Sequence, residues 1–294
     1  MKRGFTHGGL FHADEVMATA MLKVIYPDLE IFRVHEVPED LVETDIVFDI
    51  GGGELDHHMV RRERANGVLY AACGLVWRRY GAQILKAYDC PGDLITSAWA
   101  VVENSMVVGI DARDNGQYNE NDFPAYELGD IINSFNKNWD EETDADDLFH
   151  EAVDFASIIL KRRVMKAIST AKARGVVDEA VANAQEQTYM VLSEYVPWQG
   201  ALKRNPDGEH INYVVYPSLR GGYNVQVVPG VSFPEQWCGK TVHTLREELE
   251  IPELMFFHQG RFLCAVKTIE GAKKLIRAAE SAPYDEGELY EQTS

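Results

Sequence analysis

Cysteine pairs and long apolar runs are the first features that this sequence lacks. Its 294 residues include only four cysteines, and no two of them form a C-x-x-C pair. A chain of this length can bury a core without disulfide bonds, so we expect reduced and mostly buried thiols. No run of about 18 apolar residues occurs, which argues against a transmembrane span. The first residues also lack the apolar stretch of a secretory signal, and we expect a cytoplasmic protein without a membrane partner.

Positive charge is also scarce. Lys and Arg together number 28 and Asp and Glu number 47, which gives a formal net charge of −19. A protein that coats long DNA or RNA depends on Lys and Arg meeting phosphates, so this composition disfavours one. A short phosphate ligand held by a local site is not excluded. The sequence has neither an H-E-x-x-H motif nor a nucleophile elbow, which argues against a protease.

Apolar segments of two kinds alternate in the first half of the chain. Gly4–His7, Glu30–Val34 and Asp45–Ile50 have strand patterns, and the last is a continuous apolar run typical of a buried parallel strand. Helical patterns alternate with them: Asp14–Tyr26, Val68–Ala87 and much of Leu94–Val107. This alternation predicts an α/β fold whose N-terminal domain, residues 1–140, holds a mainly parallel sheet flanked by helices.

The pattern changes in the second half. A long helical segment, Asp144–Ala173, and a second helix reaching about Gln187 predict linker helices over residues 141–187. Five strand patterns and a helix follow: Tyr189–Leu192, Tyr213–Tyr216, Tyr223–Val228, Leu254–His258, Phe262–Val266 and the helix Gly271–Ala279. Arg220-Gly221-Gly222 is typical of a hairpin turn between two of these strands. We therefore expect a smaller C-terminal α+β domain over residues 188–294.

Histidines are concentrated near the N-terminus. Five of the nine lie within the first 58 residues: His7, His12, His35, His57 and His58. Carboxylates accompany four of them, with Asp14 beside His12 and Asp49 and Asp56 before His57 and His58. Imidazole and carboxylate are common metal ligands. No companion motif surrounds His35, which we interpret as a structural or surface residue.

The histidines and their neighbouring carboxylates follow predicted strands. Asp111 and Asp114 follow one more apolar run, Met106–Ile110, which we also expect to be a strand. The carboxyl ends of parallel strands meet at one edge of a sheet, where ligands bind in open α/β folds. The segments therefore predict one crevice with more ligands than a single ion can use. Two divalent ions about 3.5–4 Å apart, sharing one carboxylate, would use them and suit displacement at phosphorus.

Each motif alone has an ordinary explanation. A His-x4-His pair occurs by chance, and an Asp at a strand end is commonly a cap or a turn former. The combination of these motifs, in this order and at strand ends, favours a metal site. The mixed ligand set suits Mn²⁺, Fe²⁺, Co²⁺ or Zn²⁺ better than Ca²⁺.

These motifs resemble a known family. Thr6-His-Gly-Gly-Leu-Phe-His-Ala-Asp-Glu15, Asp56-His-His58 and Ile110-Asp-Ala-Arg-Asp-Asn-Gly116 are similar to the MYG family (melanocyte proliferating gene homologues) of metal-dependent hydrolases, within the DHH phosphoesterase superfamily. The likeness extends to Phe256–Phe262 and to Lys267-Thr268. It implies a DHH-like N-terminal domain holding two Mn²⁺ or similar ions, with Zn²⁺, Fe²⁺, Co²⁺ and Mg²⁺ as alternatives. A linker helix would lead to a smaller domain that binds substrate.

The resemblance also implies residue roles. His7 and His12 would bind one metal, Asp14, His57 and Asp111 the other, and Asp49 would bridge the two. His58 would face the substrate phosphate, with Asp49 and Asp56 completing the catalytic group. Asp56 would orient a histidine, and Asp114 would lie outside the ligands. Many superfamily members have an Asp near the position of His12, so this imidazole favours softer ions.

The C-terminal domain would hold the distal part of the substrate through glycine-rich turns, a histidine and basic residues. The candidates are Arg220, Gly221, Gly222, His258, Gly260 and Lys267. Their ordinary interpretation is turn glycines and surface bases. Lys161, Arg162, Arg163 and Lys166 form a basic helix face that would line a phosphate cleft or meet solvent. Base stacking would need exposed aromatics, for which Trp139, Trp198, Trp237 and Tyr223 are available.

Three functions follow from these observations. The resemblance implies a metal-dependent phosphoesterase acting as a 3′–5′ exonuclease on short RNA or oligonucleotides. The alternative within the same chemistry is hydrolysis of a small phosphorus compound: pyrophosphate, a phosphoadenosine or a cyclic dinucleotide. A metal-stabilised binding protein without turnover is the third, and a homo-oligomer is compatible with all of them.

Overall fold

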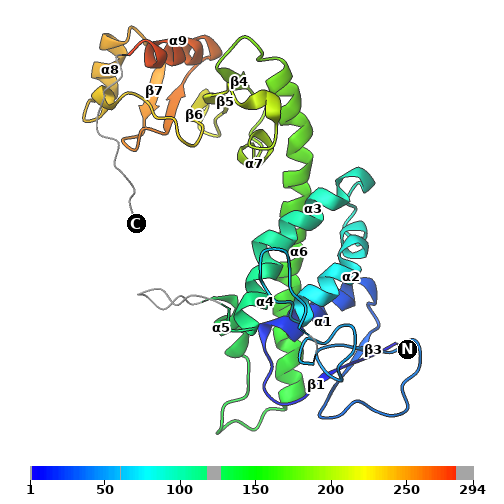
Figure 1. The fold of residues 1–294 in the computed structure, drawn as a ribbon. Coiled ribbons are helices and arrows are strands. Elements are labelled where there is room, and N and C mark those ends of the chain that lie inside the picture. Colours follow the sequence, from blue (N-terminus) through cyan, green and yellow to red (C-terminus); the bar gives the residue numbers. More distant parts are fainter. Residues whose placement is uncertain (1, 60, 118–126, 283–294) are drawn as a thin grey trace. The chain divides into compact units, whose positions relative to one another are not determined.

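The chain folds into two compact units, which we describe from a computed structural model (Figure 1). The structure describes residues 2–59, 61–117 and 127–282. Unit 1 covers Met1–Ala171 and unit 2 covers Lys172–Ser294. The boundary between them lies within one long helix, α6 (Ala145–Ala182). The predicted division at residues 140 and 187 stays a prediction.

Unit 1 contains a parallel three-stranded sheet in the order β2-β1-β3. Its strands are β1 (Arg3–His7), β2 (Glu30–Val34) and β3 (Ile46–Val47). Helix α1 (Ala13–Ile25) connects β1 to its parallel neighbour β2, as a parallel pair requires. Central strand β1 buries Phe5, and its C-terminal residue is His7. The predicted α/β class with a parallel sheet is confirmed, although β3 is shorter than its apolar run.

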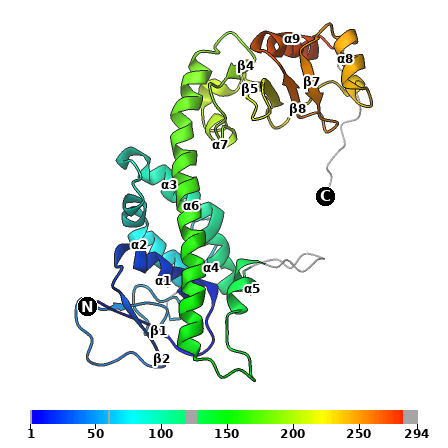
Figure 2. The same ribbon diagram turned by 180° about the vertical axis from the view of Figure 1, so that it is seen from behind.

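Helices form most of the core of unit 1. Figure 2 shows α1 beside the first half of α6. The remaining helical elements of unit 1 are α2 (Ala72–Ala87), η1 (Gly92–Leu94), α3 (Ile95–Val102), the π-helical turn η2 (Glu103–Val107), α4 (Val108–Asp114) and α5 (Leu128–Asn133). Trp77 of α2 and Phe149 of α6 are completely buried in this core. The core therefore fixes the helices on which several site residues lie.

Two secondary-structure predictions are wrong. Met106–Ile110 is not a strand, because it lies in η2 and α4. A five-residue apolar run fits a buried helix as well as a buried strand, and periodicity cannot separate them. The predicted second linker helix is absent from the described chain, because α6 continues without a break to Ala182.

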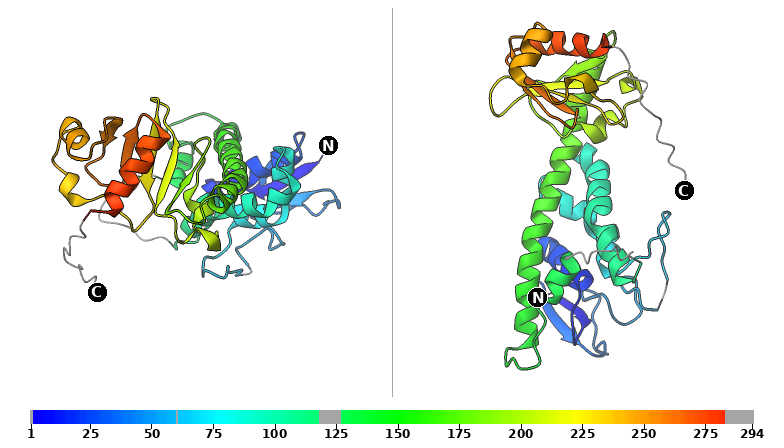
Figure 3. Two further views of the ribbon diagram at one scale, coloured as in Figure 1. Left: turned by 90° about the horizontal axis from the view of Figure 1, so that it is seen from above. Right: turned by 90° about the vertical axis from the view of Figure 1, so that its left-hand side faces the viewer.

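Unit 2 is an α+β unit built on a five-stranded mixed sheet in the order β4-β5-β6-β8-β7. Its strands are β4 (Tyr189–Val191), β5 (Tyr213–Pro217), β6 (Tyr223–Val227), β7 (Leu254–Phe257) and β8 (Leu263–Val266). Its shorter helices are α7 (Gln199–Leu202), η3 (Pro206–Gly208), η4 (Glu235–Trp237), α8 (Val242–Glu248) and α9 (Ile269–Glu280). Helix α9, red in Figure 3, packs against β5, β6 and β8. All five predicted strands are confirmed within one or two residues.

The predicted hairpin is also confirmed. β5 and β6 pair antiparallel, and Gly221 and Gly222 between them have φ values of 86° and 69°. A Cβ on Gly222 would lie 2.2 Å from the carbonyl oxygen of Val266, so this turn requires glycine for space as well as conformation. Separately, no helix among the described residues is long and apolar enough to span a membrane.

Candidate metal centre

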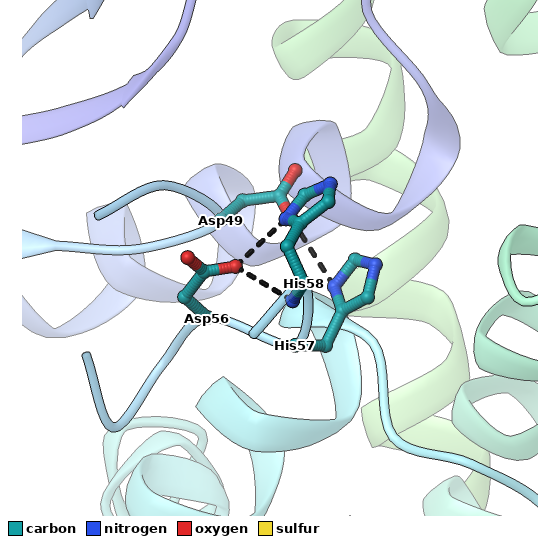
Figure 4. A group of neighbouring side chains, drawn as sticks. All are labelled: Asp49, Asp56, His57 and His58. Carbon is teal, nitrogen blue, oxygen red and sulfur yellow. Dashed lines mark hydrogen bonds and ion pairs between the residues drawn. The ribbon is translucent and has the colours of Figure 1, made fainter. Parts of the chain in front are cut away.

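Segments distant in sequence converge at one end of the sheet in unit 1. β1 brings His7, the start of α1 brings His12 and Asp14, and the loop after β3 brings Asp49. Asp56, His57 and His58 follow on the same loop, and Figure 4 shows them around Asp49. All of these residues except Asp56 line a cavity of about 680 Å³. The predicted convergence at the strand ends is therefore present for the N-terminal segments.

His7 points one ring nitrogen at two carboxylates. Its Nε2 lies 3.1 Å from Oε1 of Glu15 and 3.3 Å from Oδ2 of Asp49. Its Nδ1 lies 3.0 Å from the carbonyl oxygen of Gly8, which can only accept a hydrogen bond. Nδ1 therefore carries the proton, and Nε2 is the atom available to a metal.

The first turn of α1 places acidic side chains in a buried position. His12 precedes the helix, and its backbone N–H donates to both carboxylate oxygens of Glu15, at 2.9 and 3.0 Å. Asp14 and Glu15 are almost completely buried, where the positive end of the helix dipole stabilises negative charge. Glu15 is a site residue that the sequence reasoning missed. Its position as the third residue of the helix, opposite the capping residue, is the signal that could have found it.

Asp49 occupies the middle of the cluster. It is buried, and its backbone has a φ of 57°, an unusual value for a residue other than glycine. Its Oδ2 lies near His7, and its Oδ1 lies 3.3 Å from Nδ1 of His57. Gly51 and Gly52, with φ values of 83° and 74°, let the chain turn back directly after it. Strained backbone of this kind is common at functional sites.

Asp56 holds His58 in place. Its carboxylate accepts hydrogen bonds from the backbone N–H groups of Gly52 and His58, at 2.6 and 3.0 Å, and from Nδ1 of His58 at 2.7 Å. The His58 ring stacks on His57 with 4.3 Å between ring centroids, and the His58 side chain is 55% exposed. Since Nδ1 donates to Asp56, Nε2 of His58 is left for a ligand in the cavity.

The third motif contributes Asp114 rather than Asp111 to the cluster. Oδ2 of Asp114 lies 3.2 Å from Nε2 of His57. Asp111 is completely buried elsewhere, where Oδ2 accepts from Arg64 at 2.6 Å and Oδ1 accepts from the backbone N–H of Gly74 at 2.9 Å. The structure therefore does not bring Asp111 together with the other predicted ligands, and its role as a ligand stays a prediction.

The donor set fits divalent cations. Potential ligand atoms lie within 4.8 Å of one another in four overlapping groups: Asp49, Asp56, His57 and His58; His7, His12 and Glu15; His12, Asp14 and Asp114; Asp14, Glu15 and Asp49. Oδ1 of Asp14, Oδ1 of Asp49 and Nδ1 of His57 are buried without a hydrogen-bond partner. Buried polar atoms without partners are costly. Cations bound between these groups would satisfy all three atoms.

Close packing of carboxylates and imidazoles shifts several pKa values in the centre. Hydrogen bonds to Asp49 and Glu15 raise the pKa of His7 to about 11. Burial opposes protonation of His57, but the close carboxylates of Asp114 and Asp49 outweigh it and raise its pKa to about 10. Burial, followed by repulsion from Asp49, raises the pKa of Asp14 well above its usual value. Without cations, protons therefore supply the positive charge that these carboxylates require.

Metal binding is expected to tighten as the pH rises. His7 and His57 hold protons at neutral pH, since their pKa values are about 11 and about 10, and an imidazole must lose its proton to bind a metal. Each displaced proton changes affinity by about tenfold per pH unit. Calorimetric Mn²⁺ titrations from about pH 7 to about pH 9 should show rising affinity, and buffers of different ionisation enthalpy should report proton release. A pH-independent affinity without proton release would contradict this expectation.

The predicted C-terminal substrate residues lie in unit 2. Arg220 and Lys267 are exposed, and Gly222 lies in the β5–β6 turn. Nδ1 of His258 accepts from the backbone N–H of Gly260 at 2.9 Å, and its ring lies 4.2 Å from that of Phe262. Their roles toward substrate stay predictions.

The candidate tryptophans differ in their exposure, and the basic residues of α6 differ in whether they line the cavity of the metal centre. Trp198 and Trp237 are buried in unit 2 and are not available for base stacking, whereas Trp139 is 96% exposed. Of the basic residues Lys161, Arg162, Arg163 and Lys166 on α6, only Arg163 lines the cavity of the metal centre, and all four are exposed. The basic face of α6 is therefore mainly solvated.

The fold and the site define the class of protein: an α/β protein whose imidazole and carboxylate side chains form a candidate metal centre. The family model MYG1_exonuc, described as "Uncharacterised protein family (UPF0160)", matches residues 5–279. The chain belongs to this family, which confirms the resemblance found in its motifs.

Relatives match over nearly the whole chain. A MYG1 protein of Schizosaccharomyces pombe is 26% identical, with 95% of this chain and 97% of the relative covered. A MYG1 exonuclease of Homo sapiens is 28% identical, with 93% and 84% covered. Among solved structures, RecJ from Thermus thermophilus in complex with Mg²⁺ is 16% identical with a TM-score of 0.26. That match covers 96% of this chain and about half of RecJ, at 50%.

Proposed function

We propose that the protein is a 3′–5′ exonuclease that hydrolyses phosphodiester bonds of short RNA or other oligonucleotides, using two divalent metal ions. The observation that carries the proposal is the buried Asp49, whose two oxygens face His7 on one side and His57 on the other. A carboxylate in this position suits the bridge between two ions. Relatives named MYG1 exonuclease support the choice of a nucleic-acid substrate.

We assign the ligands in two sets that share Asp49. His7, His12 and Glu15 form one group of close ligand atoms and would hold one ion. Asp14, Asp114 and His57 would hold the second, with Asp114 in the place that the resemblance gave to Asp111. Imidazole and carboxylate ligands together suit Mn²⁺, and we assign Mn²⁺ as the physiological ion.

The chain's own residues would orient the phosphate and manage its protons. When bound, the ions would neutralise phosphate charge and activate a water for in-line attack. His58 presents Nε2 to the cavity while Asp56 fixes Nδ1, so Nε2 can accept a proton in the neutral ring, and the doubly protonated ring can donate that proton to a phosphate oxygen. Arg163 at the cavity wall suits a neighbouring phosphate of the same strand. Arg220, Gly222, His258 and Lys267 of unit 2 are proposed to hold the distal part of the strand.

Replacing His58 with alanine is expected to retain both metals and to lower kcat by about 10²–10⁴-fold, the usual contribution of a general acid or base. The reason is that Nδ1 of His58 is engaged by Asp56 and its side chain is half exposed, so the ring faces substrate. Elemental analysis of the purified variant measures the metals, and initial rates measure turnover. His243→Ala, in an exposed position on α8, is the control. Loss of metal from His58→Ala would contradict the substrate-facing role.

A substrate panel tests the function. Mn²⁺-loaded protein should hydrolyse RNA oligomers from two residues upward, with nucleoside 5′-monophosphates released from the 3′ end. Labels at the 5′ and at the 3′ end separately show the direction of attack. Turnover restricted to pyrophosphate, a phosphoadenosine or a cyclic dinucleotide would replace this proposal with the small-molecule alternative. Metal binding without any turnover would favour the binding protein.

A further inference from the structure

A second cavity in unit 1 has more basic than acidic residues in its lining, whereas the whole chain is acidic. It measures about 510 Å³ and is lined by Glu54, Leu55, Arg62, Leu75, Arg78 and Arg79, which we call the arginine groove. Three arginines and one glutamate line it, although acidic residues outnumber basic ones by 47 to 28 in the sequence. Buried Leu55 and Leu75 contribute its apolar lining. The groove therefore concentrates positive charge on an acidic protein.

Two elements supply the arginines independently. Arg78 and Arg79 are consecutive exposed residues of α2, and Arg62 comes from the segment that follows the Asp56-His57-His58 loop. Arg79 forms an ion pair with Glu54, whose side chain is 83% exposed. An exposed pair of this kind contributes little, so an incoming anion can replace Glu54. The guanidinium of Arg78 lies 5.6 Å from the centre of the Tyr70 ring, a contact that leaves its N–H groups available.

Arg62 links the groove to the metal centre. It donates hydrogen bonds to the backbone carbonyl oxygens of Asp56 at 2.6 Å and Gly53 at 3.4 Å. Asp56 in turn fixes the ring of His58. The groove thus shares a wall with the loop that carries the metal-centre histidines, and a ligand that contacts Arg62 also contacts the support of that loop.

We propose that the arginine groove is a phosphate-binding site, separate from the metal centre. Arginine presents N–H donors in a planar fork that matches phosphate oxygens in pairs, and several arginines at one site favour a phosphate over a carboxylate. The phosphate comes either from a free nucleotide or from the part of an oligonucleotide strand beyond the scissile bond. Binding there requires no metal ligand and no hydrolysis, so it is independent of the proposed nuclease activity.

Titrations of the full, Mn²⁺-loaded chain test the site with two probes. One probe is adenosine 5′-monophosphate, followed by calorimetry, and the other is a phosphorothioate hexanucleotide that resists hydrolysis, followed by fluorescence anisotropy. The test variant is Arg78→Gln combined with Arg79→Gln, since both side chains are exposed and, unlike Arg62, neither donates a hydrogen bond to the backbone of the described loop. The matched control is Arg61→Gln, because Arg61 is 72% exposed, pairs with Glu63 and lies outside the groove lining.

The site predicts an affinity at least about tenfold lower in the double variant than in the wild type, with Arg61→Gln close to wild type. A loss for adenosine 5′-monophosphate identifies a free nucleotide as the source of the phosphate. A loss for the hexanucleotide alone identifies the strand. Thermal midpoints within about 2 °C of wild type show that the double variant is folded. The proposal is overturned if both probes bind the double variant as they bind the wild type, if neither binds the wild type, or if Arg61→Gln loses as much.

Discussion

Asp49→Ala is expected to abolish phosphoesterase activity and to remove both metal ions while the chain stays folded. Removing even the hydrogen-bond partner of a metal ligand typically costs about 10–100-fold in affinity or activity. Loss of a carboxylate whose oxygens face His7 and His57 should therefore cost more than about a hundredfold. Rates with saturating Mn²⁺ and metal content by elemental analysis measure the two effects.

Asp49→Asn separates the effect of the charge from the effects of side-chain size and backbone conformation. Asn adopts the left-handed backbone conformation more readily than most residues, so it keeps the φ of 57° and the size of the side chain while removing the charge. Asp45→Ala is the control, because Asp45 lies directly before β3, pairs with Arg3 of β1 and belongs to none of the four groups of close ligand atoms. Full Mn²⁺-dependent activity in Asp49→Ala would show that the bridging assignment is wrong.

Arg64→Met is expected to destabilise the protein by about 3–5 kcal/mol, the usual effect of removing one partner from a buried ion pair. Arg64 bridges Glu103 and Asp111 at 2.6 Å each, and all three side chains are less than 10% exposed. Met fills a similar volume but leaves both carboxylates without a cation. Equilibrium urea unfolding measures the change, and Arg61→Met on the exposed surface is the control.

The pH dependence identifies the cause. Burial raises the pKa of Asp111 to about 7 even with Arg64 beside it. A carboxyl whose pKa is raised on folding favours the folded state below its unfolded pKa of about 3.9 and loses that contribution as the pH rises through the folded value. Without Arg64 the folded pKa of Asp111 should rise further, so the deficit should grow between about pH 6 and pH 8. A deficit that does not vary with pH would indicate lost packing instead.

The sequence was sufficient to predict that most of the candidate metal ligands lie close together. His7, His12, Asp14, Asp49 and His57 come from three segments with recognisable spacing: the end of β1, the start of α1 and the loop after β3. Residues that directly follow parallel strands lie close together in space, because the carboxyl ends of parallel strands meet at one edge of the sheet. The prediction of the strands in unit 2 succeeded for a similar reason, since alternation and turn glycines are local signals.

Other parts depend on tertiary packing and could not be predicted. Whether Asp111 or Asp114 joins the centre depends on the rotation of α4, which was expected to be a strand end. Asp111 accepts a hydrogen bond from Arg64, which lies 47 positions earlier in the chain, and no local sequence pattern predicts that ion pair. Glu15 was overlooked because a Glu in a first helical turn is ordinary. Its burial distinguishes it, and burial depends on the whole unit.

The number of residues in the π-helical turn η2 affects which side chains of α4 point toward the metal centre. A π turn contains one residue more than an α turn, and one residue rotates everything after it by about 100° around the helix axis. That rotation sets which carboxylate of α4 faces Arg64 and which faces His57. Substitutions within Glu103–Val107 preserve this angular phase, whereas a single-residue deletion would shift both carboxylates at once. For protein engineering, the number of residues in this segment is therefore the property to preserve if Asp111 and Asp114 are to keep their directions.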